Sequence, residues 1–200
     1  MRLIVVYDLM GYKSLSRILC FTAKYIRASG IVLLGNTASP TIVEWLSSNC
    51  RLRTLGVLGE CDSPALAVAL SRSGELLECK YTEYGGLSLI GVGLSGCHDL
   101  PERSVDVVFT SQPGFQYTCC HSGWDWVDRV IERVKPKLVI IGGCERPCLN
   151  LNKRVFSPGT VRLGFIGVVE YTEDTGLSQR YYNIEEILFN LLRRQPGNFV

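Results

Sequence analysis

The chain has 200 residues, of which 46% are hydrophobic and 20% charged, and its formal net charge is +2. This composition excludes a disordered chain and indicates a globular protein with a sizeable core. The small net charge and the scattered basic residues make nucleic acid an unexpected partner. The apolar start of the chain is broken at Asp8, which fits a first strand better than a signal peptide, and no apolar run has the roughly 18 residues of a membrane span. We therefore expect a cytoplasmic protein without a membrane segment.

The cysteine content is high for a cytoplasmic protein, at nine residues. The adjacent Cys119 and Cys120 and the Cys144-x3-Cys148 spacing lack the paired C-x2-C knuckles of a structural zinc site. The simplest interpretation is that the cysteines are small buried hydrophobic side chains. One or two disulfides are the alternative, since intracellular proteins of hyperthermophiles tolerate them. The excess of arginine over lysine also leans towards a thermophile.

The first 70 residues alternate short apolar runs with amphipathic stretches. We expect strands at 3–7, 31–35 and 53–58 and helices at 13–29, 41–49 and 63–70, because the apolar residues follow strand and helix periods in turn. Continuous apolar strands that alternate with helices predict a parallel sheet covered on both faces.

The second half of the chain begins with a hairpin signal. Gly85 and Gly86 separate apolar segments at 77–84 and 87–92, which is typical of a β-hairpin. Further strands are expected at 105–110, 137–141, 154–157 and 161–171, with a helix at 124–134. Since no linker interrupts this pattern, residues 1–172 are expected to form one domain.

Residues 173–200 are expected to form a C-terminal extension with an amphipathic helix at 183–194. Asn183 and Glu186 have the spacing of a capping box. The apolar residues of this helix share one face. The helix either packs on its own domain or docks on a protein partner or a second copy of the chain.

The predicted strand ends carry the candidate site, because ligands of α/β sheets bind at the carboxyl ends of the strands. The chain offers six motifs in order: Asp8-Leu9-Met10-Gly11, Gly35-Asn36, Gly59-Glu60-Cys61-Asp62, Thr110-Ser111-Gln112-Pro113, Gly142-Gly143-Cys144-Glu145 and Ser157-Pro158-Gly159-Thr160. Their order and spacing, over residues 2–172, resemble the calcineurin-like metallophosphoesterases of the small archaeal and bacterial type. That family carries D-x-H-G, G-D, G-N-x-D, T-H-x-P, G-H-x-H and N-P-G-S. The resemblance implies an α/β fold, an α/β/β/α sandwich of two mixed sheets flanked by helices.

The resemblance also implies a two-metal hydrolase, but the ligand positions depart from the family. The seven positions hold Asp8, Met10, Asn36, Glu60, Ser111, Gly143 and Glu145, and only Asp8 matches the family ligand. Two adjacent dications need a bridging carboxylate to offset their repulsion, and a neutral asparagine supplies no charge. The imidazoles that suit manganese, iron and zinc are replaced.

We therefore expect a catalytically degenerate phosphoesterase-fold protein that acts as a metal-independent binding or scaffold protein without a cofactor. The alternative is a divergent phosphoesterase that hydrolyses a phosphomonoester, a phosphodiester or a nucleotide. It would use weakly bound Mg or Mn on Asp8, Glu60 and Glu145, with Asp62 as a further carboxylate, because carboxylates suit such metals. Otherwise these carboxylates are neutralised locally, for instance by Arg146. A third interpretation is a metal-free sensor of a phosphorylated ligand that uses residues 157–160.

Three further features have both a functional and a structural interpretation. His121 either acts as an acid or base or is structural. Cys61 is a nucleophile only if its pKa is lowered, and neither histidine is its neighbour in sequence. Aromatic residues near the fourth motif either form a partner surface, as aromatic anchors do, or belong to the core; they are Phe115, Tyr117, Trp124 and Trp126.

Overall fold

The layering of the molecule follows from the alternation of side chains along its first strand. In this computed structural model, which describes residues 1–97, 100 and 102–193, strand β1 (Arg2–Val6) is almost fully buried. Ile4 and Val6 contact helices on one side, while Leu3 and Val5 face a second sheet on the other. Successive side chains of a strand point to opposite faces, so an unbroken apolar strand requires cover on both faces.

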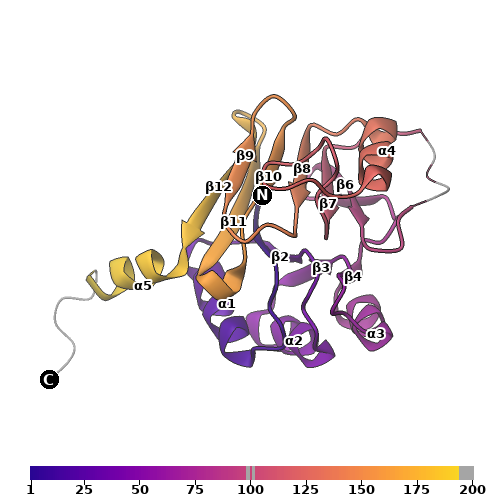
Figure 1. Ribbon diagram of the computed structural model, residues 1–200. Coiled ribbons are helices and arrows are strands. Elements are labelled where there is room, and N and C mark those ends of the chain that lie inside the picture. The colour runs from indigo at the N-terminus through magenta and orange to yellow at the C-terminus, as the bar shows by residue number, and fades with distance from the viewer. Residues whose placement is uncertain (98–99, 101, 194–200) are drawn as a thin grey trace, which may run out of the picture.

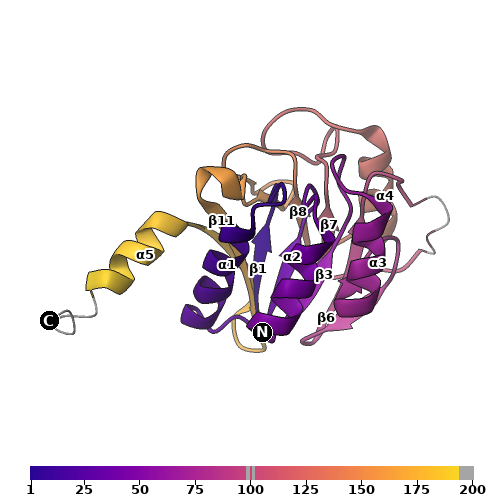
Figure 2. The same ribbon diagram turned by 90° about the horizontal axis from the view of Figure 1, so that it is seen from below.

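The first sheet contains β1 at its centre and has the order β12-β11-β1-β2-β3-β4. Strands β2 (Gly30–Leu33), β3 (Arg53–Gly56) and β4 (Glu75–Leu76) continue from β1 in parallel. Helices α1 (Lys13–Tyr25), α2 (Pro40–Trp45) and α3 (Pro64–Ser73) cover its outer face (Figure 2). A π-helical turn, Leu46–Cys50, follows α2.

The second sheet has the order β5-β6-β7-β8-β10-β9. Its strands are β5 (Thr82–Tyr84), β6 (Leu87–Val92), β7 (Val107–Thr110), β8 (Leu138–Ile141), β9 (Cys148–Asn150) and β10 (Val155–Ser157). The four inner strands are parallel, and β5 and β9 run antiparallel at the edges. Helix α4 (Asp125–Val134) packs on the outer face of this sheet (Figure 1).

These layers enclose three apolar cores. One lies between α1–α3 and the first sheet, one between the two sheets, and one between the second sheet and α4. The predicted α/β/β/α sandwich of two mixed sheets is therefore confirmed. Within the described residues, every helix is too short or too polar to span a bilayer.

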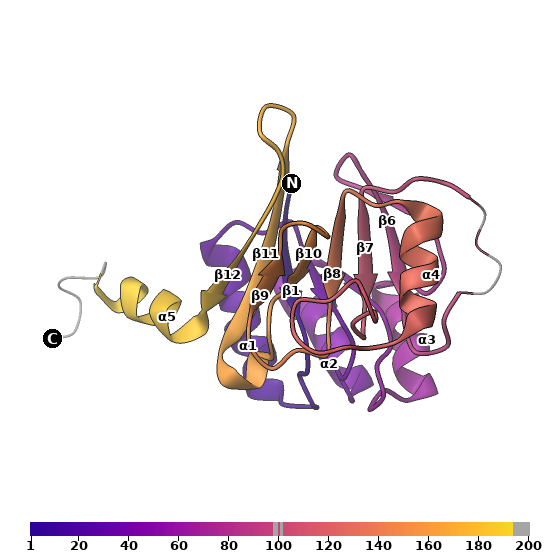
Figure 3. The same ribbon diagram turned by 45° about the horizontal axis from the view of Figure 1, so that its top comes forward.

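The C-terminal part of the first sheet differs from the sequence expectation. A short 3-10 turn at Val161–Leu163 precedes β11 (Phe165–Thr172), which pairs along its whole length with β12 (Gly176–Asn183). The expected boundary at residue 172 therefore falls at the tip of a hairpin (Figure 3). β12 is an edge strand whose residues are all exposed or half-buried and several of them polar, so a search for apolar runs does not find it.

Helix α5 (Ile184–Arg193) follows β12 directly and projects from the body of the molecule (Figure 1). Asn183 caps it, since its Oδ1 accepts a hydrogen bond from the Glu185 amide at 2.8 Å. Ile184 and Ile187 are each 5% exposed and join the first core, whereas Phe189 is 54% exposed. Residue 194 of the expected helix lies outside the described residues.

The interpretation of the cysteines as isolated buried side chains is wrong. The structure joins them in four disulfides: Cys20–Cys50, Cys79–Cys97, Cys119–Cys148 and Cys120–Cys144. Cys61 is the remaining thiol and is exposed. The paired residues are 18 to 30 positions apart in sequence, and only the packing of the intervening elements brings them together.

Candidate functional site: a pocket at the carboxyl edge of both sheets

The candidate site is a pocket of about 630 Å³ at the edge where the parallel strands of both sheets end. Three of its walls are the loops that follow β1, β2 and β3, and the opposite walls follow β8 and β10. The lining residues are Tyr7, Asp8, Met10, Asn36, Cys61, Gly143, Cys144, Glu145, Thr160, Arg162 and Leu163. The parallel order of the strands brings these loops together, as expected for a ligand site of an α/β sheet.

The loops after β1 and β2 are joined by backbone hydrogen bonds. The Met10 amide donates to the Asn36 carbonyl at 2.8 Å, and the Gly11 amide donates to the Thr37 carbonyl at 2.9 Å. Asp8, Met10 and Asn36 all have left-handed backbone conformations, with φ of 71°, 48° and 53°. Such conformations are costly for non-glycine residues and persist only where the surroundings impose them, which is common in binding loops.

Asp8 is already paired within the protein. Its Oδ2 accepts hydrogen bonds from Arg162 Nε at 2.7 Å and from Thr160 Oγ1 at 2.9 Å. Asp8 is 6% exposed, so these two donors supply the partners that a buried carboxylate requires. The expected neutralisation of this carboxylate therefore occurs, but through Arg162 rather than Arg146.

Asn36 joins three of the pocket loops. Its Nδ2 donates to the Tyr7 hydroxyl at 3.1 Å, and its Oδ1 accepts from the Cys61 amide at 3.1 Å. Burial raises the pKa of Tyr7 to about 12, and the negative charges of Asp8 and Glu60 act in the same direction. Tyr7 is therefore a neutral phenol at physiological pH and serves here as a hydrogen-bonding group.

Gly143 and Ser111 occupy positions where the family has histidines. Gly143 has φ of 79°, and a Cβ atom built on it would lie 2.7 Å from Cδ of Pro113, so a side chain there would be strained and would displace the proline. Ser111 is fully buried, and its hydroxyl has no hydrogen-bond partner among the described residues. It lies behind the pocket lining rather than in it.

The remaining carboxylates do not share one centre. Glu60 is exposed and accepts a hydrogen bond from Gln112 Nε2 at 3.3 Å, while Glu145 is exposed at the pocket. Asp62 accepts from the amides of Ala38 at 2.6 Å and Gly59 at 2.8 Å, and burial raises its pKa. Among the described residues, the acidic side chains form no group of three with ligand atoms within 4.8 Å of one another.

Comparison with solved structures identifies the architecture. The protein TT1561 of Thermus thermophilus is 13% identical, with a TM-score of 0.69 over 92% of this chain and 98% of that chain. An archaeal phosphodiesterase is 13% identical, with a TM-score of 0.62 over 91% of this chain and 100% of that chain. YfcE, a phosphoesterase from E. coli, is 14% identical, with a TM-score of 0.50 over 92% and 100%.

The chain has the metallophosphoesterase-like fold. No family model and no curated protein sequence matches the chain, and identities this low establish the fold alone. The resemblance found in the six sequence motifs is therefore confirmed at the level of the fold.

The metallophosphoesterase-like fold implies a pair of metal ions, and the residues present do not fit them. Arg162 and Thr160 hold the Asp8 carboxylate, and the Asn36 side chain is engaged by Tyr7 and Cys61. Gly143 provides no ligand atom. A dication at Asp8 would have to compete with a guanidinium charge 2.7 Å from the carboxylate oxygen.

Sequence reasoning placed five of its seven pocket residues in the lining and missed several others. Asp8, Met10, Asn36, Gly143 and Glu145 line the pocket, whereas Glu60 and Ser111 do not. The residues it missed as site members are Tyr7, Arg162 and Leu163. Arg162 lies two positions after the end of the sixth motif, and its charge beside that motif is the signal that could have revealed it.

His121 and the aromatic residues lie away from the pocket lining. His121 is exposed, and its carbonyl accepts a hydrogen bond from Thr118 Oγ1 at 2.7 Å. Phe115 and Trp124 are 61% and 49% exposed, while Tyr117 and Trp126 are partly buried against the core of α4. The aromatic group is thus divided between surface and core.

Proposed function

We propose that this protein is a metal-independent binding protein that uses the metallophosphoesterase-like fold without its hydrolytic chemistry. The observation that supports this most is the ion pair between Arg162 and Asp8. Asp8 is the one family ligand that the sequence keeps, and its buried oxygen is already satisfied by an internal cation. A metal bound to this carboxylate would have to share it with the guanidinium charge on Oδ2.

The electrostatics of the pocket support the same proposal. In a two-metal centre, a shared carboxylate offsets the repulsion between the ions, and Asn36 has no charge to contribute. Asn36 instead spans the loops after β1, β2 and β3. We infer that its role is to fix the shape of the pocket.

The pocket itself suits a small polar ligand. Its wall presents the half-exposed guanidinium of Arg162, whose side chain is 51% exposed, together with the exposed carboxylate of Glu145. The strained backbone at Asp8, Met10 and Asn36 supports a binding role, because strain of this kind is usually kept where loops must hold a ligand.

A metal and turnover assay on the full chain tests this proposal. We expect protein washed with a chelator and then incubated with Mn²⁺ to retain less than one ion per chain. We also expect hydrolysis of bis(p-nitrophenyl) phosphate at the rate of the buffer blank. Asp8→Ala should leave that rate unchanged.

The matched control is Asp174→Ala, which removes an exposed aspartate in the β11–β12 turn. The proposal fails if the wild type and Asp174→Ala turn over the diester and Asp8→Ala does not. That outcome would establish the divergent phosphoesterase instead.

We further propose that the partner is a second copy of this chain, docked through α5, in the cytoplasm. Ile184 and Ile187 anchor the first turn of α5 in the domain. Phe189 is exposed on this helix, which projects from the body of the molecule (Figure 1). Four disulfides are unusual in the cytoplasm except in hyperthermophiles, so this location is proposed together with a thermophilic source. Alkylation of thiols in rapidly quenched cells would show whether the disulfides are formed inside the cell. Protein found only in an exported fraction would refute the cytoplasmic location.

A further inference from the structure

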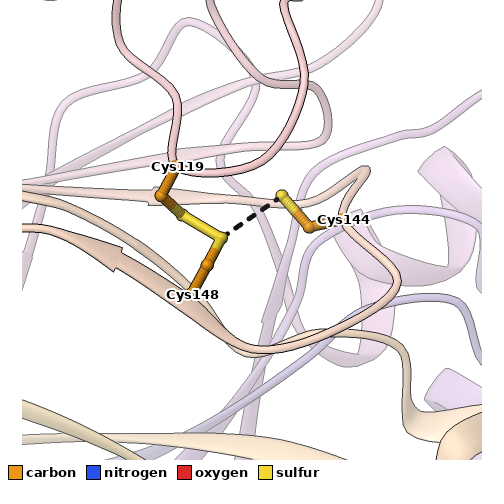
Figure 4. A group of neighbouring side chains, drawn as sticks. All are labelled: Cys119, Cys144 and Cys148. Carbon is orange, nitrogen blue, oxygen red and sulfur yellow. Dashed lines mark hydrogen bonds between the residues drawn. A yellow bond between two sulfur atoms is a disulfide. The ribbon is translucent and has the colours of Figure 1, made fainter.

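Four cysteines gather in one place beside the pocket. Cys119 and Cys120 lie in the loop between β7 and α4, and Cys144 and Cys148 lie between β8 and β9. Two disulfides, Cys119–Cys148 and Cys120–Cys144, connect the loops. The Cys148 sulfur of the first is also 3.8 Å from the Cys144 sulfur of the second (Figure 4). The sulfurs of Cys119, Cys144 and Cys148 all lie within 4.8 Å of one another.

This cluster differs from the other two disulfides. Cys20–Cys50 and Cys79–Cys97 are single pairs. Among the described residues, Cys119, Cys144 and Cys148 of this cluster are the one group of three or more potential ligands close enough to hold a metal. Cys144-x3-Cys148 has a ligand spacing that structural zinc sites use, and Cys119 and Cys120 are connected to it from a second segment.

One sulfur–sulfur separation in the cluster equals the edge of a tetrahedral zinc site. Zinc–thiolate bonds of about 2.3 Å place neighbouring sulfurs about 3.8 Å apart in a regular tetrahedron. The unbonded sulfurs of Cys144 and Cys148 already have this separation, at 3.8 Å.

The backbone that carries the sulfurs is held by bonds other than the disulfides. Asn150 Nδ2 donates to the Thr118 carbonyl at 3.0 Å and so joins the two segments. The Cys120 amide donates to Thr118 Oγ1 at 3.2 Å, which fixes the turn at the adjacent cysteines. Cys144 is 1% exposed. These hydrogen bonds position the two segments in addition to the disulfides.

We propose that Cys119, Cys120, Cys144 and Cys148 are a redox-switched zinc site. In the reduced state the four thiolates bind one Zn²⁺. Two molecules of an oxidised small-molecule disulfide, such as oxidised glutathione, each accept two electrons. The products are the two protein disulfides, four small-molecule thiolates and free Zn²⁺. All-sulfur ligation selects soft or borderline metals, and zinc is not itself reduced or oxidised by the thiols.

The switch would act on the pocket. Cys144 lies between Gly143 and Glu145, and all three residues line the pocket. Exchange of a disulfide for a metal bond at Cys144 would shift this wall. The proposal does not depend on the pocket's proposed function, because its metal ligands are the four cysteines and do not include Asp8.

Metal titration of the reduced protein tests the proposal. Full-length protein is reduced with a phosphine, freed of reductant and titrated anaerobically with Co²⁺. We expect a thiolate-to-cobalt charge-transfer band with the d–d bands of a tetrahedral site, and its loss when one equivalent of Zn²⁺ is added. Cys148→Ser should weaken binding by more than the about 10–100-fold that loss of an outer-shell partner costs.

The matched control is Cys61→Ser, which removes the exposed thiol and should leave the titration unchanged. Circular dichroism confirms that each variant is folded, and Cys120→Ser provides a second variant at an exposed position. The proposal is overturned if cobalt produces no charge-transfer band, or if the band is unchanged in both folded variants. Binding of iron but not zinc would also overturn it.

Oxidation of the zinc-loaded protein tests the switch itself. Oxidised glutathione should release one Zn²⁺ per chain to a chromogenic chelator. Alkylation should show that the four cluster thiols are oxidised at the same rate as the zinc is released. Zinc that stays bound while these thiols are oxidised, or release without their oxidation, contradicts the switch.

Discussion

The ion pair between Asp8 and Arg162 is the contact on which the proposal of a metal-independent binding protein mainly rests. Its carboxylate is nearly buried, whereas the guanidinium is half exposed. Solvent screens the cation, so the pair is worth less than a fully buried one. The main effect of the pair is to give the nearly buried Asp8 carboxylate a positive partner. In a metal centre, the metal ion would be that partner.

Arg162→Ala should lower the free energy of unfolding by about 1–2 kcal/mol, because Asp8 is left with the Thr160 hydroxyl alone. Urea denaturation under non-oxidising, non-reducing conditions measures the change. Arg146→Ala, at an exposed neighbour of the same pocket, should change stability by less than about 0.5 kcal/mol. Equal effects of the two variants would show that the ion pair is not what stabilises Asp8.

Single residues of the site were predictable only in part. The strand-end rule placed Asp8, Asn36 and Gly143 in the pocket because their loops follow parallel strands. The rule gives no information on pairs such as Asp8 and Arg162, which are 154 positions apart. The steric limit at Gly143 was equally hidden, because it depends on Pro113 from another loop.

At the scale of elements, the helices and inner strands were predictable because their apolar residues follow one period. The edge strands β9 and β12 were not, whereas the edge strand β5 was predicted as part of the hairpin around Gly85 and Gly86. β9 is half-buried or exposed throughout, and β12 alternates exposed with half-buried residues, so neither has the continuous apolar character of an inner strand. Each becomes a strand by pairing with its neighbour in sequence, β10 or β11, and an edge strand that is partly exposed does not need the apolar sequence of an inner one.

Two substitutions in helix α5 distinguish its anchoring residue from its proposed docking residue. Ile187→Ala should lower the free energy of unfolding by about 2–4 kcal/mol, since Ile187 is buried in the first core. Phe189→Ser should change the free energy of unfolding of the domain little. It should shift the molar mass measured by light scattering from dimer towards monomer. Phe21→Ser is the control, because Phe21 is similarly exposed, at 48% against 54%, on α1. A wild type that is monomeric at all concentrations refutes docking through α5.

At the scale of the whole molecule, the four disulfides are distributed over both sheets. Cys20–Cys50 joins α1 to the π-helical turn after α2, on the outer face of the first sheet. The other three lie around the second sheet. The sequence shows that nine cysteines exist, but their pairing is a property of the assembled layers.

The oxidised protein should therefore have one reactive thiol. Alkylation in denaturant without reductant should label Cys61 alone, and full reduction should expose all nine cysteines.

Loss of the Cys20–Cys50 crosslink in the Cys20→Ala/Cys50→Ala double variant should cost about 3 kcal/mol of stability, because the unfolded chain regains the entropy of a closed loop. Urea unfolding without reductant measures this loss. A thiol reductant should then destabilise the double variant less than the wild type, since one of its four crosslinks is already gone; equal losses would show that Cys20 and Cys50 are not joined in solution.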